Sequence, residues 1–358
     1  MEKPNASKCM FGCLKPECPT LQVQEEDMLT SKKERYLGDI LASDGKIEEN
    51  LKTRVDKGIG VINQILGLLE NIAFGEFYFE MALLFRNSLL INGTLYNMEA
   101  LHGIKNKHLD IIEECDKMLM RRLFNCPEGT PLEAFFLETS ALPVRFILMG
   151  RRLMYYWTIL NKPKDELVRE VFDAQNMFRT KDSWIVQVEN DLKTCDIDLS
   201  EEEIKNLSKY KMKKLVNKQI RIKAHEYLLQ LKDSHEKTEH LYSSDKMQDY
   251  LQSMDITKKE KILLFKLRIW MIQIKANFSS SNRNGIHCDL CDDKDSEETQ
   301  VHMLQCKALV NHPDLKEEIQ TINHDDIFKD IASQVKAAKV WSKIMDVRKV
   351  ILGRKDKK

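Results

Sequence analysis

Three cysteines and one histidine near the end of the chain have the spacing of a metal site. They form the pattern C-x2-C-x10-H-x3-C, with Cys288, Cys291, His302 and Cys306 as its members. Two cysteines separated by two residues can reach one ion from a tight turn, and H-x3-C places the second pair about one helical turn apart. Zinc takes four such ligands in a tetrahedron, which leaves no open position for a substrate. We therefore expect a structural zinc ion, with His287 as a less favoured substitute for His302; the alternative is four ordinary residues.

A run of positive charge precedes this pattern. Between positions 205 and 223 there are eight basic residues and no acidic one. Lys211, Lys214, Lys218 and Arg221 fall at spacings of three and four, so they share one face of a helix that we expect to begin after Ser200. Such a face can follow a phosphate backbone and would make binding depend on salt. The alternative is a helix face that is simply solvated.

The elements that must position these residues are mostly helices. Apolar residues recur every three or four positions from 47 to 69, and again in helices expected at 258–276 and 327–345. The first forty residues differ, because the β-branched or aromatic segments 20–24 and 34–41 flank a polar stretch and favour a hairpin of two strands. The expected fold class is therefore mainly α, with a short β-hairpin at its N-terminus.

Three segments carry the sequence pattern of a helix start. Ser200 and Thr257 are each followed three residues later by glutamate, which can return the capping hydrogen bond. Thr130 offers the same pattern with Pro131 in the first helical position. We expect each of the three residues to cap a helix.

Composition restricts the class of protein. The 358 residues contain 56 basic and 56 acidic side chains, and nine cysteines in irregular spacing. An odd, irregular cysteine set without a secretory leader favours a reducing compartment, and no apolar run reaches the roughly 18 residues of a membrane span. We expect a soluble, intracellular protein, nuclear or cytoplasmic, with no membrane partner. Phosphate-binding loops, serine-hydrolase elbows and zinc-protease motifs are all absent from the sequence.

Four segments, taken in order, resemble a known family. They are "ERYLGDILASDGKIEENLKTRVDKGIG", "FEMALLFRNSLLINGTLYNMEAL", "FFLETSALPVRFILMGRRLMYYWTIL" and the Cys-Cys-His-Cys pattern. Together they resemble the C-terminal part of the reverse transcriptase of a non-LTR, LINE-type retrotransposon, over nearly the whole chain. The segment around "YLG" is similar to the primer-grip region at the end of the palm, the following helices to the thumb and connector, and the metal pattern to a zinc knuckle.

This resemblance implies an organisation of the chain. Residues 1–45 would be a palm remnant with a primer-grip-like hairpin, 46–180 a thumb-like helical domain, 181–280 a helical connector with the basic helix, and 286–358 the zinc knuckle with a C-terminal helix. Because a thumb grips the template–primer duplex, the resemblance also suggests backbone contacts for three residues of the first long helix: Lys52, Arg54 and Lys57.

The resemblance also implies which chemistry is missing. In this family the carboxylates that hold two Mg²⁺ ions precede the "YLG" region, so we expect neither bound Mg²⁺ nor catalysis from this chain. The expected function is a non-catalytic fragment that binds RNA or DNA through its basic surface and knuckle. Two alternatives stay open: a helical protein-interaction scaffold, favoured by the acidic stretch from Asp289 to Glu298, and a truncated piece of an active RNA-directed DNA polymerase.

Overall fold

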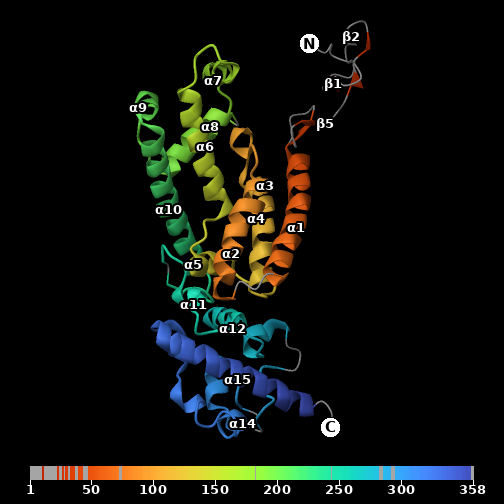
Figure 1. Ribbon diagram of the computed structural model, residues 1–358, viewed down its shortest axis with the longest axis vertical. Helices are drawn as coiled ribbons and strands as arrows, with labels where there is room; N and C mark the ends of the chain where they lie inside the picture. Colours follow the sequence, from red (N-terminus) through yellow and green to blue (C-terminus); the bar gives the residue numbers. More distant parts are fainter. Residues whose placement is uncertain are drawn as a thin grey trace.

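The protein is mainly helical, as the sequence predicts. The computed structural model describes residues 47–355 except 72–74, 182, 243, 282–284 and 292–294, together with short strands between residues 10 and 42. Figure 1 shows the long helices α1, α4, α6 and α10 running along the upper part of the molecule, while α15 lies across the lower part.

The elements have the following bounds. The strands are β1 Met10–Phe11, β2 Gln22–Val23, β3 Glu26–Asp27, β4 Leu29–Thr30, β5 Lys33–Tyr36 and β6 Asp39–Ala42. The α-helices of the upper part are α1 Glu48–Asn71, α2 Tyr78–Phe85, α3 Asn92–Thr94, α4 Asn106–Leu123, α5 Leu132–Thr139, α6 Val144–Leu160, α7 Leu167–Met177, α8 Trp184–Thr194, α9 Glu201–Asn206 and α10 Lys209–Asp233. Those that follow are α11 Asp249–Gln252, α12 Lys258–Arg268, α13 Gln300–Gln305, α14 Lys307–Val310 and α15 Ile331–Lys355. Shorter turns of 3-10 helix are η2 Gly75–Phe77, η4 Met98–Ala100, η5 Ala276–Ser281, η6 Ile319–Thr321 and η7 His324–Phe328, and η3 Arg86–Ile91 is a π-helix.

The pairing of the strands differs from the prediction. β5 pairs with β6 in antiparallel register, with Tyr36 opposite Asp39, so the chain reverses inside the segment that was expected to be one strand. β2 pairs with β3 instead of with that segment.

The apolar face of α1 forms as its spacing predicts. Leu51, Ile62 and Ile65 are fully buried, and α1 packs along α4. At Gly58 of α1 a Cβ atom would lie 3.1 Å from the sulfur of Cys115 of α4. The absence of a side chain at position 58 therefore lets the two helices approach closely.

Two hydrophobic cores cross the predicted domain boundaries. One joins α6, α8 and α10, with Tyr156, Trp184 and Val216 among its buried residues, so it spans the boundary expected between residues 180 and 181. The other extends from α1 and α4 through α12 to Trp341 of α15. Cys306 belongs to this second core, so the segment 286–358 packs onto the helical body rather than standing apart from it.

Local capping follows the sequence at two of the three predicted starts. Ser200 and Thr257 form complete capping boxes with glutamates three residues later. The prediction for Thr130 is wrong, because its hydroxyl donates to the carbonyl of Pro127 and α5 begins after Pro131 without a side-chain cap. The helix opened by Ser200 is also short: α9 ends at Asn206 and a second start, capped by Ser208, begins α10.

Buried ion pairs tie distant helices together. Arg86 of η3 bonds Asp116 of α4, and both side chains are 1% exposed. Arg268 of α12 bonds Glu138 of α5 at 3.0 Å, and its guanidinium also donates to the carbonyl of Ile327 at 2.6 Å. Buried charges are tolerated only when they are paired in this way, so these contacts fix how the elements are arranged.

Candidate metal centre and basic helix

The four predicted ligands come together at one point. Cys288 and Cys291 lie in a narrow ribbon in which the amide of Cys288 donates to the carbonyl of Ser296 at 2.9 Å. His302 lies on α13, whose first turn is capped by the hydroxyl of Thr299. Cys306 ends that helix, and its carbonyl accepts from the amides that open α14. The ribbon therefore supplies one pair of ligands and the helix end supplies the other.

The distances fit a tetrahedral ion. All four ligand atoms lie within 4.8 Å of one another. The sulfurs of Cys288 and Cys306 are 3.9 Å apart, and the sulfur of Cys291 is 3.5 Å from Nε2 of His302. Metal–ligand lengths of about 2.3 Å for sulfur and 2.0 Å for nitrogen in a tetrahedron require about 3.8 Å between sulfurs and about 3.5 Å between sulfur and nitrogen. These two distances match a tetrahedral site, and the cluster could hold a metal ion.

Burial divides the ligands into two kinds. Cys288 and Cys306 are buried in the core, while Cys291 and His302 are half-buried. The Cys306 thiol lies beside the sulfur of Cys288; their hydrogen bond lowers the pKa of Cys288 and raises that of Cys306. An ion that binds both sulfurs as thiolates has to displace their protons.

The carboxylate of Glu298, four residues before His302, bonds the segment that contains the cluster to α15. Glu298 is fully buried, and both of its oxygens accept bonds of 3.0 Å from Arg348 of α15. The amide of Lys275 donates to the same carboxylate at 2.8 Å. Sequence analysis did not find this pair, because fifty residues separate its members and neither belongs to a recognisable motif.

The basic residues of α10 lie where the sequence places them. Lys211, Lys214, Lys218 and Arg221 are all exposed on one side of the helix. Within the described part of the chain none of the four forms an ion pair, whereas Lys223 pairs with Asp196 and Glu226 at the other side. Four neighbouring cations without acidic partners form an electropositive surface, which we call the basic face of α10.

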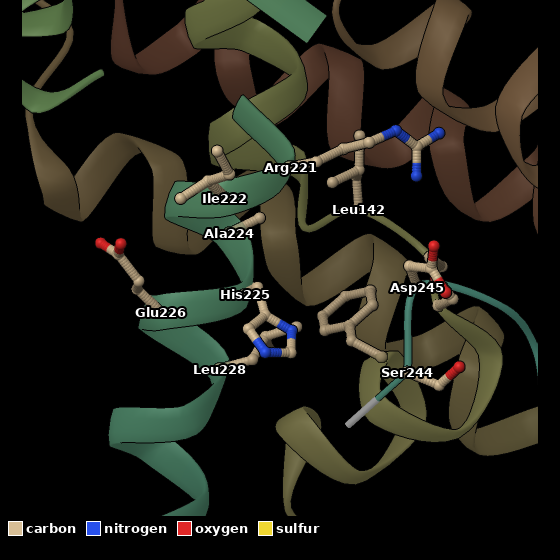
Figure 2. Close-up of a pocket in the computed structure, with 12 residues that line it drawn as sticks. Leu142, Arg221, Ile222, Ala224, His225, Glu226, Leu228, Ser244 and Asp245 are labelled. Atoms are coloured by element: carbon tan, nitrogen blue, oxygen red, sulfur yellow. The ribbon is translucent and has the colours of Figure 1, made fainter. Parts of the chain in front are cut away.

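Arg221 differs from the lysines because it borders two hollows. It lines a cavity of about 400 Å³ between α10 and the segments that follow α5 and precede α11. Figure 2 shows its side chain extending past Leu142, with Asp245 on the same side of the cavity. A second hollow, of about 450 Å³, continues from Arg221 toward Arg151 of α6.

The three residues proposed for the first long helix behave differently from one another. Lys52 and Lys57 are exposed on α1. The prediction for Arg54 is wrong: it is 5% exposed, and its guanidinium donates to Asn50 and to the carbonyl of Thr94 at 3.0 Å. A phosphate cannot reach it. In Figure 1, α1 and α10 stand at opposite edges of the bundle, so the structure does not bring the two predicted basic sets together.

No helix among the described residues is long and apolar enough to cross a membrane. Comparisons with protein-family models, with curated proteins and with solved structures find no match to this chain. The resemblance to retrotransposon reverse transcriptases therefore stays a prediction from the sequence.

Proposed function

We propose that this protein binds RNA or DNA through the basic face of α10, and that a structural zinc ion at the Cys-Cys-His-Cys cluster stabilises its C-terminal part. The observation that carries the proposal is the set of exposed, unpaired cations at Lys211, Lys214, Lys218 and Arg221. Their spacing of three and four residues along a helix suits successive contacts with a phosphate backbone.

Zinc is the metal that the ligand set favours. Three thiolates and one imidazole at tetrahedral spacing suit zinc better than the oxygen-seeking Mg²⁺. With four protein ligands the ion has no open position, so its role would be to hold the ribbon and α13 together. We propose no reaction for this chain: in the retrotransposon resemblance it would correspond to the thumb, connector and knuckle, which bind nucleic acid rather than transform it.

The test is a binding titration at several salt concentrations. A variant in which Lys211, Lys214 and Lys218 are all changed to Gln should bind a 20-nucleotide single-stranded RNA more weakly than the wild type. If each lysine contacts one phosphate, the slope of log affinity against log salt should become about 2 units less steep. Fluorescence anisotropy of labelled RNA and of an RNA–DNA heteroduplex measures both quantities.

A charge-matched control separates local contact from net charge. Lys316, Lys339 and Lys349 are exposed in the C-terminal part, and changing all three to Gln removes the same charge elsewhere. Equal losses in the two triple variants, or no salt-dependent binding by the wild type, would contradict the proposal. The latter outcome would favour the interaction scaffold, for which Leu167 and Val171 of α7 and the adjacent Phe178 offer exposed apolar surface.

A further inference from the structure

Another cavity, which includes none of the four residues of the basic face, is lined by aromatic rings. It has a volume of about 890 Å³ and lies between the end of α12, the start of α13 and η7. Four of its lining residues are His240, Trp270, His324 and Phe328. None of them belongs to the Cys-Cys-His-Cys cluster or to the basic face, and no sequence motif joins them.

The rings are arranged as walls. Trp270 and His324 stack at 4.9 Å between centroids with 25° between their planes. His240 stands nearly perpendicular both to Trp270, at 85°, and to Phe328, at 77°. In such edge-to-face contacts the edge of one ring lies on the face of the other, and the guanidinium of Arg268 lies over Phe328, 5.0 Å from its ring centre. The π face of an aromatic ring carries negative potential, which attracts such a positive charge.

Hydrogen bonds hold the two imidazoles in place. Nε2 of His324 lies 2.9 Å from the amide oxygen of Gln300, which is itself fully buried and donates to the carbonyl of Leu267. Nε2 of His240 bonds the carbonyl of Arg268. Burial lowers the pKa of His324, so the ring stacked on Trp270 is neutral at physiological pH. The walls are thus fixed before any ligand arrives.

Trp270 occupies a backbone conformation that its side chain does not favour. Its φ is +53°, directly after α12, where the amide of Met271 returns to the carbonyl of Lys266 at 2.8 Å. This is the left-handed closing turn of a helix, a position that glycine usually fills. A bulky residue is strained in this conformation, and such strain is found most often at binding sites. The turn does not need an indole at position 270, whereas the aromatic lining of the cavity includes it.

The charged residues that line the cavity favour a positively charged ligand. Glu236, Glu239 and Asp325 are exposed on its lining. The ammonium of Lys237 lies 6.0 Å from the ring centre of Phe278 and 3.4 Å from the carbonyl of Asn277. Three carboxylates against one ammonium disfavour a phosphate. A metal ion is also disfavoured, because the described residues hold no second group of three His, Cys or carboxylate ligand atoms close together.

We infer that this cavity binds an organic cation, of the quaternary or methylated ammonium class, against Trp270. The indole would attract the positive charge while the methyl groups fill the apolar space, and the carboxylates would attract the cation from solution. This site is independent of the basic face, so either proposal can fail without the other.

The test compares a cation with its neutral isostere. Choline and 3,3-dimethylbutan-1-ol have nearly the same shape, and only choline is charged. In calorimetric or ligand-observed NMR titrations of the full chain, choline should bind at least tenfold more tightly than the alcohol. Equal affinity for the two, no binding of choline at tens of millimolar, or stronger binding of adenosine than of choline would overturn the inference, the last by indicating a nucleobase site.

Trp270→Gly provides the decisive variant. Glycine suits the left-handed backbone, so the fold should persist, with unchanged helicity and zinc content, while choline binding is lost. Binding that survives in this variant would overturn the inference. A second variant, Glu236→Gln with Glu239→Gln, should weaken choline severalfold without changing binding of the alcohol, whereas the distant exposed pair Glu170→Gln with Glu202→Gln should change neither.

Discussion

Cys291 and His302 are the two ligands of the metal cluster that solvent can reach, while Cys288 and Cys306 are buried in the core. A substitution at Cys291 therefore removes a ligand with little loss of packing. We predict one zinc ion per chain in protein purified under reducing conditions, and its loss in Cys291→Ser. Elemental analysis of the two proteins measures this.

Cys126→Ser is the matched control for that measurement. Its thiol is half-buried and donates to the carbonyl of Phe124, and burial raises its pKa to about 11. Among the described residues it belongs to no group of three potential ligands. It should keep its zinc. Retention of zinc by Cys291→Ser, or its absence from the wild type, would show that the cluster is not a zinc site.

The meeting of Cys288, Cys291, His302 and Cys306 was predictable because the pattern is local: two short spacings suffice to identify the group. Their surroundings were not. Glu298 bonds Arg348, which lies fifty residues further along the chain. Arg54 was predicted to be exposed because its sequence neighbours do not show that its guanidinium donates to the buried carbonyl of Thr94. Side-chain burial depends on which elements pack together, and a single residue's neighbours along the chain do not reveal that.

Among the elements, α12 depends on one buried ion pair for its position. Arg268 and Glu138 are 1% and 0% exposed, and they join α12 to α5 and, through Ile327, to η7. Arg268→Ala should lower the free energy of unfolding by about 3–5 kcal/mol, because it leaves a buried carboxylate without its partner. Urea denaturation followed by circular dichroism measures this loss.

A double-mutant cycle distinguishes lost pairing from lost packing. Arg268→Met combined with Glu138→Gln should be more stable than the sum of the two single changes predicts, since neither charge is then left alone. Strict additivity would contradict a role for the pair.

The boundaries of the helices and strands were predictable only where residues within one turn determine them. The capping boxes at Ser200 and Thr257 were predictable because a cap and its glutamate lie within one turn. The break between α9 and α10 was missed because basic residues occur on both sides of it and suggested one continuous helix. Ser208 is nevertheless a favoured cap residue and caps α10. The hairpin after β5 was missed for a related reason: two strands of four residues were taken as one.

Across the whole molecule, the effect of removing a bound metal on stability depends on the hydrophobic core that contains Cys288 and Cys306. Cys288 and Cys306 pack in the same cluster as Phe265 and Trp341, while α6, α8 and α10 form a cluster of their own. Structural zinc contributes about 10–16 kcal/mol of apparent binding energy in small peptides. We predict that EDTA leaves most of the helicity intact but loosens α13, α14 and the docking of α15.

Hydrogen exchange read by mass spectrometry can locate that change. Amides of α6 and α10 should keep their protection after chelation, and those of α13 and α15 should lose theirs. Simultaneous loss over all of these helices would mean that the two cores unfold as one unit.

The position of α15 has a consequence for how the chain is made. Trp341 completes a core whose other members, such as Phe265 and Phe135, leave the ribosome long before it does. Until then the face of α12 that packs on α15 has no cover, and Arg348 has not yet reached Glu298. During synthesis the cluster of α6, α8 and α10 can close early, while the lower half remains open to chaperones and proteases until its last helix emerges.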